Sequence, residues 1–495
     1  MRWVLLTAAV ALALSLFLFA WDADGAFLVH DPLFFAVNAE TRPWSSLIGH
    51  HPAFHVLVNF TTAGARACGL EHPGHVGVRV VSGLGAAAIV LLLAAIAGPG
   101  RRGLGAAFAL PLLATRGFLL EAGAGENVLP ACAAGLAALW FASRAEVGSW
   151  KVGIALVVAL VLRQDNILIL PGVLTAFAMT RSAGERWRGS LRLLAGAGLA
   201  ALGLYLVGWW ISAPELRFDH YLFHMMTYEW MPVHDQLPSA ARFADHFAVS
   251  GVAVVGLQGP PDARWMHVLV GIGFCAAMLA AGSLLRGRDR TTPFAISAIV
   301  VLAVRAPFYA WFEPHNFEWW MLSLVVIVGA SVATARGEAR FAIGVRRLAI
   351  GLLVVLTAAI LAWHLPWTLR LQDRTLARAR DDALELGKSA EGCRYFAYRS
   401  RAEAAFVIVG APVNGYTLKG SPEEAMKTLG VVVGQSEGPV VLLLDRFIYM
   451  GTPYGMRHGF DPLARFVMDE AEIPGRESRS EKGRVRVLGW RVGGG

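Results

Sequence analysis

The chain has 495 residues, of which 56% are hydrophobic and 16% charged, and its mean hydropathy is +0.52. This composition excludes a soluble protein and predicts a multi-pass membrane protein, because many apolar runs are long enough to cross a bilayer. The formal net charge of +8 could suggest a nucleic-acid partner, but the basic residues lie mostly in short loops between apolar runs. Membrane topology explains them there, so we expect no nucleic-acid partner.

The N-terminus reads as a retained membrane helix. An apolar run follows Met1-Arg2-Trp3, but Leu18-Phe19-Ala20 lacks the small residue that a signal-peptide cleavage site places three positions earlier. The four cysteines form neither a CxxC pair nor a zinc-ligand spacing, so no disulfide framework is predicted.

Apolar runs predict about eleven membrane spans. They cover residues 3–20, 76–97, 103–120, 127–143, 150–162, 166–180, 191–212, 265–285, 293–312, 317–335 and 344–363. Arg2 and the loops at 100–102, 144–151, 181–192, 286–290 and 336–347 hold 16 basic residues and alternate correctly with these spans, which marks the cytoplasmic side.

Acidic residues and histidines gather on the opposite side of this topology. Of the 20 carboxylates before residue 365, 16 fall outside, and all 14 histidines lie outside or at the outer boundary. Acidic residues contribute little to orientation, so the rule that fixed the topology did not force this asymmetry. Chemistry or recognition is therefore expected to face the periplasm or its equivalent.

Three outer segments have a predicted form of their own. Residues 51–69 are apolar but carry histidines and an arginine, which favours a helix lying on the outer surface over a span. Residues 212–264 form a long outer loop, with short helices, that could act as a lid. We divide the chain into a membrane domain, 1–364, and a soluble extracytoplasmic α/β domain, 365–495, with helices at 370–388 and 422–429 and buried strands at 406–409 and 440–444.

Two carboxylates follow the first predicted span. Asp22 and Asp24 flank a single residue where the helix leaves the bilayer, and the same loop adds His30-Asp31-Pro32 and His50-His51-Pro52. A DxD spacing can be merely a solvated interfacial turn. Polar groups at a membrane boundary are nevertheless often functional, and a carboxylate there could deprotonate an acceptor hydroxyl while the other reactant stays anchored in lipid.

These motifs resemble the GT-C superfamily of membrane glycosyltransferases, including the protein mannosyltransferase and lipid A aminoarabinose transferase groups. Asp22-Ala23-Asp24 matches the acidic motif of the first outer loop in that superfamily. His50-His51-Pro52-Ala53-Phe54 is similar to its His-Pro-Pro-Leu element, with Ala53 in place of the second proline. The resemblance implies a mainly α, polytopic helix bundle of about eleven spans with a C-terminal outer domain, and it leaves the subfamily open.

Further candidate site residues lie on the same side. Glu126 lies in the loop beside the start of the fourth predicted span, and an acid in this loop of the resembling superfamily helps to position donor or acceptor; a polar hairpin tip is the alternative. Arg163 and Arg305 interrupt apolar stretches, with Arg116 a weaker third. They could bind a lipid phosphate, or could form structural pairs, Arg163 with Asp165 and Arg305 with Glu313.

Histidines complete the candidate set. His315 and Glu318 lie on the short loop between the spans at 293–312 and 317–335 and could complete a pocket. His51 and His55 have the i, i+4 spacing of metal ligands and, with Asp22 or Asp24, could hold a divalent ion, although substrate contact is the expected role of His51. We expect no resident cofactor, and the absence of GxGxxG, Walker and nucleophile-elbow patterns argues against a nucleotide-sugar site on a Rossmann fold.

The resemblance implies an inverting glycosyltransferase that moves a sugar from a polyprenyl-phosphate donor to a lipid, glycan or protein acceptor. In this hypothesis Asp22 or Asp24 is the general base, while Arg305 or Arg163 stabilises the leaving phosphate. A transporter or flippase of a lipid-linked saccharide is the alternative from another class, although transporters tend to place polar groups near the bilayer midplane. A non-catalytic subunit of envelope assembly is the third hypothesis.

Overall fold

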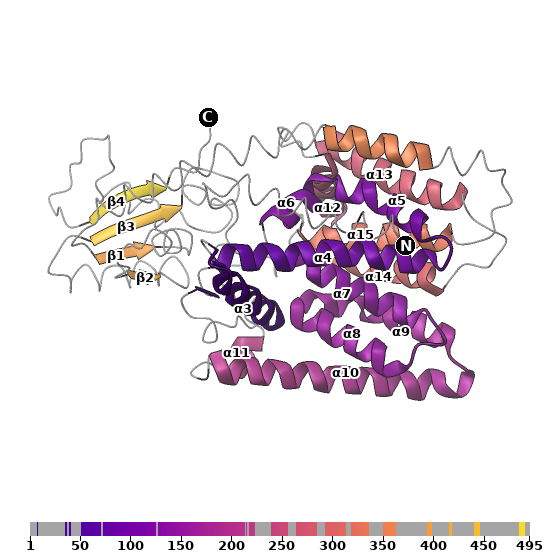
Figure 1. The fold of residues 1–495 in the computed structure, drawn as a ribbon, viewed down its shortest axis with the longest axis horizontal. Coiled ribbons are helices and arrows are strands. Elements are labelled where there is room, and N and C mark those ends of the chain that lie inside the picture. The colour runs from indigo at the N-terminus through magenta and orange to yellow at the C-terminus, as the bar shows by residue number, and fades with distance from the viewer. Residues whose placement is uncertain are drawn as a thin grey trace.

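The structure is a computed structural model, shown in Figure 1. It describes residues 7, 35–36, 39–40, 51–70, 73–124, 127–212, 214, 217–222, 239–255, 264–284, 293–312, 318–335, 350–362, 394–397, 415–417, 440–445 and 485–490. These residues are mainly helical.

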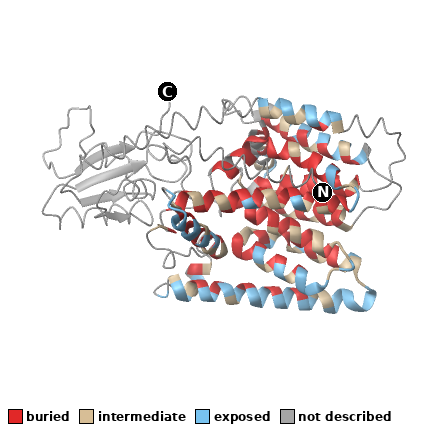
Figure 2. Ribbon diagram, in the orientation of Figure 1, coloured by how far each residue is buried: buried red, intermediate tan, exposed pale blue. Residues whose placement is uncertain are grey.

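The helices of the membrane part are α3 (Pro52–Ala67), α4 (Pro73–Ala97), α5 (Arg102–Leu113), α6 (Arg116–Ala124), α7 (Val128–Ala142), α8 (Ser149–Leu162), the 3-10 helix η1 (Gln164–Ile169), α9 (Leu170–Thr180), α10 (Ala183–Ser212), α11 (Phe218–Leu222), α12 (Ala240–Val255), α13 (Arg264–Leu284), α14 (Pro293–Phe312), α15 (Glu318–Thr334) and an apolar helix at 350–362. They form one bundle in which α4 packs against α3, α5, α7 and α15. A shared apolar core, drawn red in Figure 2, runs through α4, α5, α7, α8, α9 and α15.

Each predicted span from residue 76 onward contains an apolar helix, whereas the first, 3–20, lies outside the described residues apart from Thr7. Three helices, α4, α10 and α14, are individually long and apolar enough to cross a membrane. Five other apolar helices are 10–17 residues long. The chain is thus a polytopic helical membrane protein, and the count of eleven spans stays a prediction.

The predicted span at 103–120 is two helices, not one continuous helix. Between α5 and α6 the chain bends by 87°. Thr115 explains the break: its hydroxyl donates to the carbonyl of Leu112 at 2.8 Å and accepts the backbone N–H of Phe118 at 3.3 Å. A threonine that accepts this N–H caps the start of a new helix, which ends α5 and begins α6.

Helix α10 shows how the bundle meets its surroundings. Leu193, Ala197, Ala201 and Tyr205 recur every four residues and are buried, while most of the remaining surface is exposed and apolar (Figure 2). Trp187 and Trp210 are 73% and 72% exposed. At 1.5 Å per residue they lie about 34 Å apart, close to the thickness of a hydrocarbon core with a tryptophan at each boundary.

Helix α3 occupies the predicted surface-helix segment, but its polar side faces inward. His51, His55, Asn59 and Thr62 are buried, whereas Leu57 and Phe60 are 43% and 64% exposed. The buried side packs against α4 and Phe35, whose ring lies 4.9 Å from that of His55. These polar side chains are therefore enclosed by protein and the apolar ones face outward, while the position of α3 on the outer surface stays a prediction.

The long outer loop contains short helices, as predicted. Helix α12 packs against α13, α14 and α6. Arg242 donates to the backbone carbonyl of Trp311 at 2.8 Å, and the rings of Phe247 and Trp320 lie 5.7 Å apart. A Cβ at Gly251 would lie 1.6 Å from the carbonyl oxygen of His267, so glycine permits the close approach of α12 to α13.

Four strands from the C-terminal region form one sheet, namely β1 (Arg394–Ala397), β2 (Gly415–Thr417), β3 (Val440–Asp445) and β4 (Val485–Trp490). All neighbours pair in parallel, in the order β2-β1-β3-β4, with Phe396 opposite Leu442 and Leu442 opposite Val487. Parallel pairing requires crossover connections between the strands. β3 confirms the strand predicted at 440–444; the predicted strand at 406–409 and the two predicted helices lie outside the described residues.

We expect Gly85→Ala to destabilise the bundle. A Cβ at Gly85 would lie 2.5 Å from the backbone nitrogen of Pro130, so α4 and α7 would have to separate, at a cost of about 1–3 kcal/mol. Gly196→Ala on α10 is the control, because its Cβ meets nothing within 4 Å and alanine favours a helix. Thermal unfolding in detergent should show a lower midpoint for the first variant only; equal midpoints would contradict this packing.

Candidate functional site

The site begins at a break between α8 and α9. Arg163 is extended, with φ −160° and ψ 118°, and separates α8 from η1, as the polar interruption at 163–166 predicted. A helix end leaves carbonyls without helical partners, and here buried side chains supply donors. The amide of Asn127 donates to the carbonyl of Leu162 at 3.4 Å, and the hydroxyl of Tyr205 donates to that of Leu160 at 2.8 Å. The amide of Asn166 donates at 2.9 Å to the carbonyl of Ala159, which also accepts the backbone N–H of Arg163.

The fixed break holds the Arg163 guanidinium inside the bundle, where its side chain is 8% exposed. Its Nε donates to Oδ1 of Asp165 at 3.0 Å. Its Nη1 donates to Oδ1 of Asn127 at 3.2 Å, and its Nη2 to Oε2 of Glu318 at 3.2 Å. Arg163 therefore joins the start of α7, η1 and the start of α15 through all three of its nitrogens.

Arg305 reaches the same carboxylate from α14. It is 1% exposed, and its Nη2 lies 3.6 Å from Oδ2 of Asp165, longer than an ordinary hydrogen bond. Tyr309, one turn further along α14, donates its hydroxyl to the same Oδ2 at 2.6 Å and places its ring 4.8 Å below the Arg305 guanidinium. We call Asn127, Arg163, Asp165, Arg305, Tyr309 and Glu318 the arginine network.

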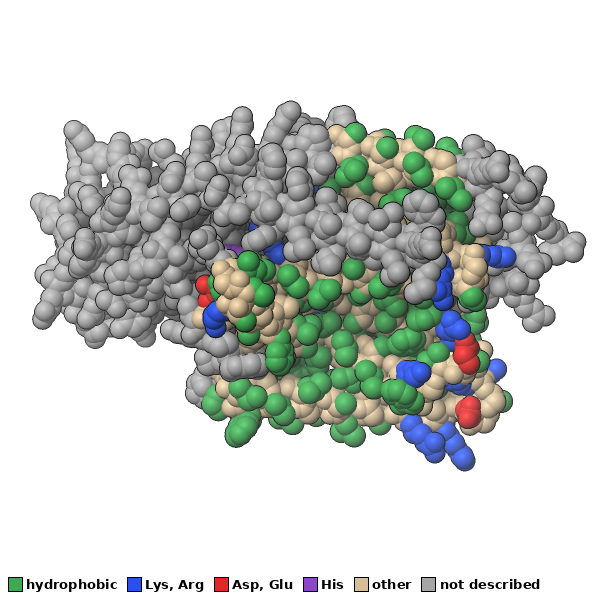
Figure 3. Space-filling view, in the orientation of Figure 1, with side chains coloured by type: hydrophobic (Ala, Val, Ile, Leu, Met, Phe, Trp, Pro, Cys, Tyr) green, Lys and Arg blue, Asp and Glu red, His purple; other side chains and the backbone are tan. Residues whose placement is uncertain are grey.

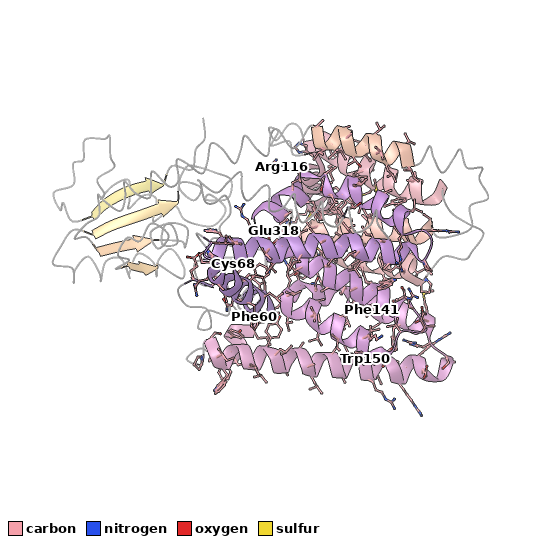
Figure 4. The ribbon with its side chains drawn as sticks, in the orientation of Figure 1. Phe60, Cys68, Arg116, Phe141, Trp150 and Glu318 are labelled. Carbon is pink, nitrogen blue, oxygen red and sulfur yellow. The ribbon has the colours of Figure 1, made fainter. Side chains whose placement is uncertain are left out.

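Two further arginines are buried at this end of the bundle. Arg79 near the start of α4 and Arg116 at the start of α6 are 4% and 5% exposed, and Glu121 on α6 is 2% exposed. Together with Arg163 and Arg305 of the arginine network, they make four buried arginines at this end among the residues that the structure describes. Figure 4 labels Arg116 and Glu318 in this region. Charged side chains are costly in a membrane domain and mark ligand or ion sites, so this end can hold an anion.

The structure brings together three of the predicted site residues, Arg163, Arg305 and Glu318. The predicted Arg163–Asp165 pair is present, while Arg305 pairs with Asp165 and Glu313 lies outside the described residues. Asp22, Asp24, Glu126 and His315 also lie outside them. His51 is buried at the start of α3, 5.9 Å from the ring of Phe35, in a layer that shares a small apolar cluster with Leu162.

A metal ligand set is not formed by the residues that the structure describes: no group of three histidine, cysteine or acidic side chains converges among them. The ion considered for His51 and His55 would need an aspartate from the segment outside the described residues.

Sequence reasoning missed Tyr309, Arg79 and the shared role of Asp165. Arg79 carried a usable signal, because it is a lone charge inside the apolar run 76–97. Tyr309 lies four residues after Arg305, the spacing of neighbours on one helix face. The pairing of Asp165 with residues 140 and more positions away left no trace in a single sequence.

Removing Arg163 should destabilise the bundle. Arg163→Met would remove the guanidinium from Glu318 and leave Asp165 with only Arg305 and Tyr309, at a cost of about 3–5 kcal/mol. The stability of Arg163→Lys should lie between those of the wild type and Arg163→Met, because an ammonium cannot reproduce the planar fork of a guanidinium. Arg217→Met is the control: Arg217 and Asp219 form an exposed pair, worth less than about 1 kcal/mol. Unfolding in detergent checks this order; an Arg163→Met midpoint equal to that of the control would contradict it.

Comparisons with known proteins bear on the fold. No protein-family model and no curated protein sequence matches the chain. Among solved structures it is similar to ArnT from Cupriavidus metallidurans in the apo state, with a TM-score of 0.55 and 13% identity over 87% of this chain and 88% of that one. ArnT is an aminoarabinose transferase of the GT-C family, and at this identity the likeness concerns the fold. The chain therefore has the GT-C-like fold that its short motifs predicted.

Proposed function

We propose that the protein is a membrane glycosyltransferase that moves a sugar from a polyprenyl-phosphate carrier to an acceptor hydroxyl on the outer side of the plasma membrane. The observation that carries this proposal is the burial of four arginines at one end of a GT-C-like bundle. Guanidinium groups recognise phosphate oxygens and keep their charge in a low dielectric. The basic loops lie at the other end, so the positive-inside rule assigns the buried arginines to the outer side.

In the proposed reaction, Asp22 or Asp24 accepts the proton of the acceptor hydroxyl. The acceptor oxygen then attacks the anomeric carbon from the face opposite the phosphate, the carbon–oxygen bond to the phosphate breaks, and the phosphate leaves with the electron pair. The configuration at the sugar carbon inverts. Phosphate is a good leaving group when its developing charge is stabilised, so the mechanism needs no resident metal.

Of the two arginines of the network, we propose Arg305 as the phosphate ligand. Arg163 has all three nitrogens committed to Asn127, Asp165 and Glu318, so a phosphate would have to displace a protein acceptor. Arg305 meets Asp165 at the longer distance of 3.6 Å and is oriented by the Tyr309 ring. Arg163 and Glu318 then act as positioning residues that hold the carboxylate between the two arginines.

Other parts of the chain would shape access to the site. We propose that Glu126, His51 and His315 contact donor or acceptor, and that the segment containing α11 and α12 covers the outer end. The C-terminal region, 365–495, is proposed as an extracytoplasmic α/β domain that guides the acceptor. Such a domain would select the acceptor, whether this is a lipid, a glycan or a protein.

A flippase of a lipid-linked saccharide is the second candidate. Buried arginines that bind a lipid phosphate would serve a carrier equally well. The proposed acids distinguish the two functions, because lipid movement needs no base beside an acceptor hydroxyl. Saccharide movement across proteoliposomes without sugar transfer would favour the flippase.

Asp22→Asn and Asp24→Asn, made separately, test the base. At least one should reduce sugar transfer from a labelled polyprenyl-phosphate donor in membranes by about 10²-fold or more, because the amide cannot accept the proton. Expression and unfolding midpoint should match the wild type. Full activity in both variants would remove the proposed base.

Arg305→Gln tests the phosphate ligand. Loss of one preorganised charge at a leaving group should lower kcat about 10²–10³-fold, with a smaller loss for Arg305→Lys. Arg66→Gln is the matched control, because this exposed arginine on α3 donates only to the backbone oxygen of Glu40 among the contacts described. Kinetics with the labelled donor, on variants that keep the wild-type unfolding midpoint, decide the result; an unchanged kcat in Arg305→Gln would overturn the assignment.

A further inference from the structure

A second charged surface lies at the opposite end of the bundle, where α8 and α10 begin. The two helices run side by side in the same direction: a Cβ at Gly153 would lie 3.6 Å from Leu193, and further along, Tyr205 bonds to Leu160. The first turn of α8 therefore lies beside the second and third turns of α10, which begins further out. We call the exposed residues there the basic–aromatic patch, comprising Trp150, Lys151, Arg186, Trp187, Arg188 and Arg192.

The patch is strongly cationic. Lys151, Arg186, Arg188 and Arg192 are exposed, and Figure 3 shows basic side chains gathered at this end, at the right of the view. Between residues 143 and 192 this end carries six basic residues and two acids, Glu146 and Glu185, a surplus of four positive charges. Glu146 pairs with Arg144, which does not belong to the patch.

The backbone beneath the patch is fixed. The guanidinium of Arg181 donates to the carbonyls of Ala145 and Val147 and lies 4.8 Å from the Phe177 ring. Thr180 donates to the carbonyl of Ala142 at 3.0 Å, which ties α9 to the same loop. A surface held in this way loses little conformational freedom when a ligand binds.

The depth of the patch matches a lipid headgroup layer. Trp150 and Trp187 are 64% and 73% exposed, and Trp187 marks one membrane boundary of α10. Arg186 and Arg188 flank this boundary, while Arg192 lies one turn further along the helix, within reach of the boundary by extending its long side chain. Lys151 places its ammonium 5.3 Å from the Trp150 ring centre, also beside α10.

We infer that the basic–aromatic patch binds the headgroup of an anionic phospholipid of the cytoplasmic leaflet. Arginine and lysine side chains would contact the phosphate oxygens, and the two tryptophans would pack against the glycerol and upper acyl region. The positive-inside rule alone requires only basic loops. Here the cations and aromatic rings lie on the first turn of α8 and the first three turns of α10, over a backbone that hydrogen bonds hold in place. The inference does not depend on the proposed enzyme activity.

The test compares two variants that remove equal charge from the same end of the protein. Lys151→Gln with Arg188→Gln alters the patch; Arg101→Gln with Arg102→Gln alters the start of α5, where the sequence contains no tryptophan. Full-length protein in nanodiscs is examined by native mass spectrometry for retained phosphatidylglycerol against phosphatidylcholine, and by thermal unfolding in discs of either lipid. No sugar transfer is measured, so failure here leaves the proposed function untouched.

We expect the wild type to retain phosphatidylglycerol selectively and to unfold at a higher temperature in its presence. Loss of two basic contacts should weaken this retention about 30-fold in the patch variant, and the control should keep the wild-type value. Equal loss in both variants would reduce the effect to general surface charge and overturn the proposal, as would the absence of any preference for the anionic lipid.

A second measurement uses the unmodified protein. A photoreactive phosphatidylglycerol should crosslink to peptides from residues 149–153 and 183–192 in preference to the peptide at 100–105. Crosslinks distributed equally over these peptides would contradict the inference even if a substitution disturbed folding.

Discussion

A guanidinium group cannot be buried in an apolar bundle without anionic or polar partners, and the outer end of this protein is organised by that requirement. Asp165 receives Arg163 on one oxygen and Arg305 with Tyr309 on the other. The carboxylate can occupy this position because the helix breaks at Arg163. The side chains of Asn127, Asn166 and Tyr205 donate hydrogen bonds to the backbone carbonyls at the end of α8, which stabilises the break. Burial of charge and interruption of the helix therefore depend on each other.

The arginine network also limits which functions are compatible with this end of the bundle. Four buried arginines lie at this end, and two of them, Arg163 and Arg305, share the carboxylate of Asp165. A phosphate ligand suits such a place, because the fixed fork of a guanidinium matches phosphate oxygens and keeps its charge in a low dielectric. The charges crowd one end of the helices, which suits a reaction at the membrane surface better than passage through the midplane.

Much of the architecture followed from patterns within single segments. Apolar runs predicted the positions of the helices from residue 76 onward, and the polar interruption at 163–166 predicted the break after α8. Arg163 and Arg305 were recognisable because a cation inside an apolar run is expensive. Their partners were not recognisable, because Asp165 and Tyr309 lie 144 positions apart in the sequence. The inward-facing polar side of α3 depends on Phe35 and α4, a contact that no local pattern reveals.

The short 3-10 helix after Arg163 affects length as well as charge. A 3-10 helix rises about 2.0 Å per residue against 1.5 Å in an α-helix, so the six residues of η1 extend about 12 Å where six α-helical residues would extend about 9 Å. With the eleven residues of α9, the segment reaches about 28 Å, near the thickness of a hydrocarbon core, although it has only 17 residues. The larger rise of η1 thus lets a segment of only 17 residues place Arg163 at one membrane boundary and Arg181 at the other.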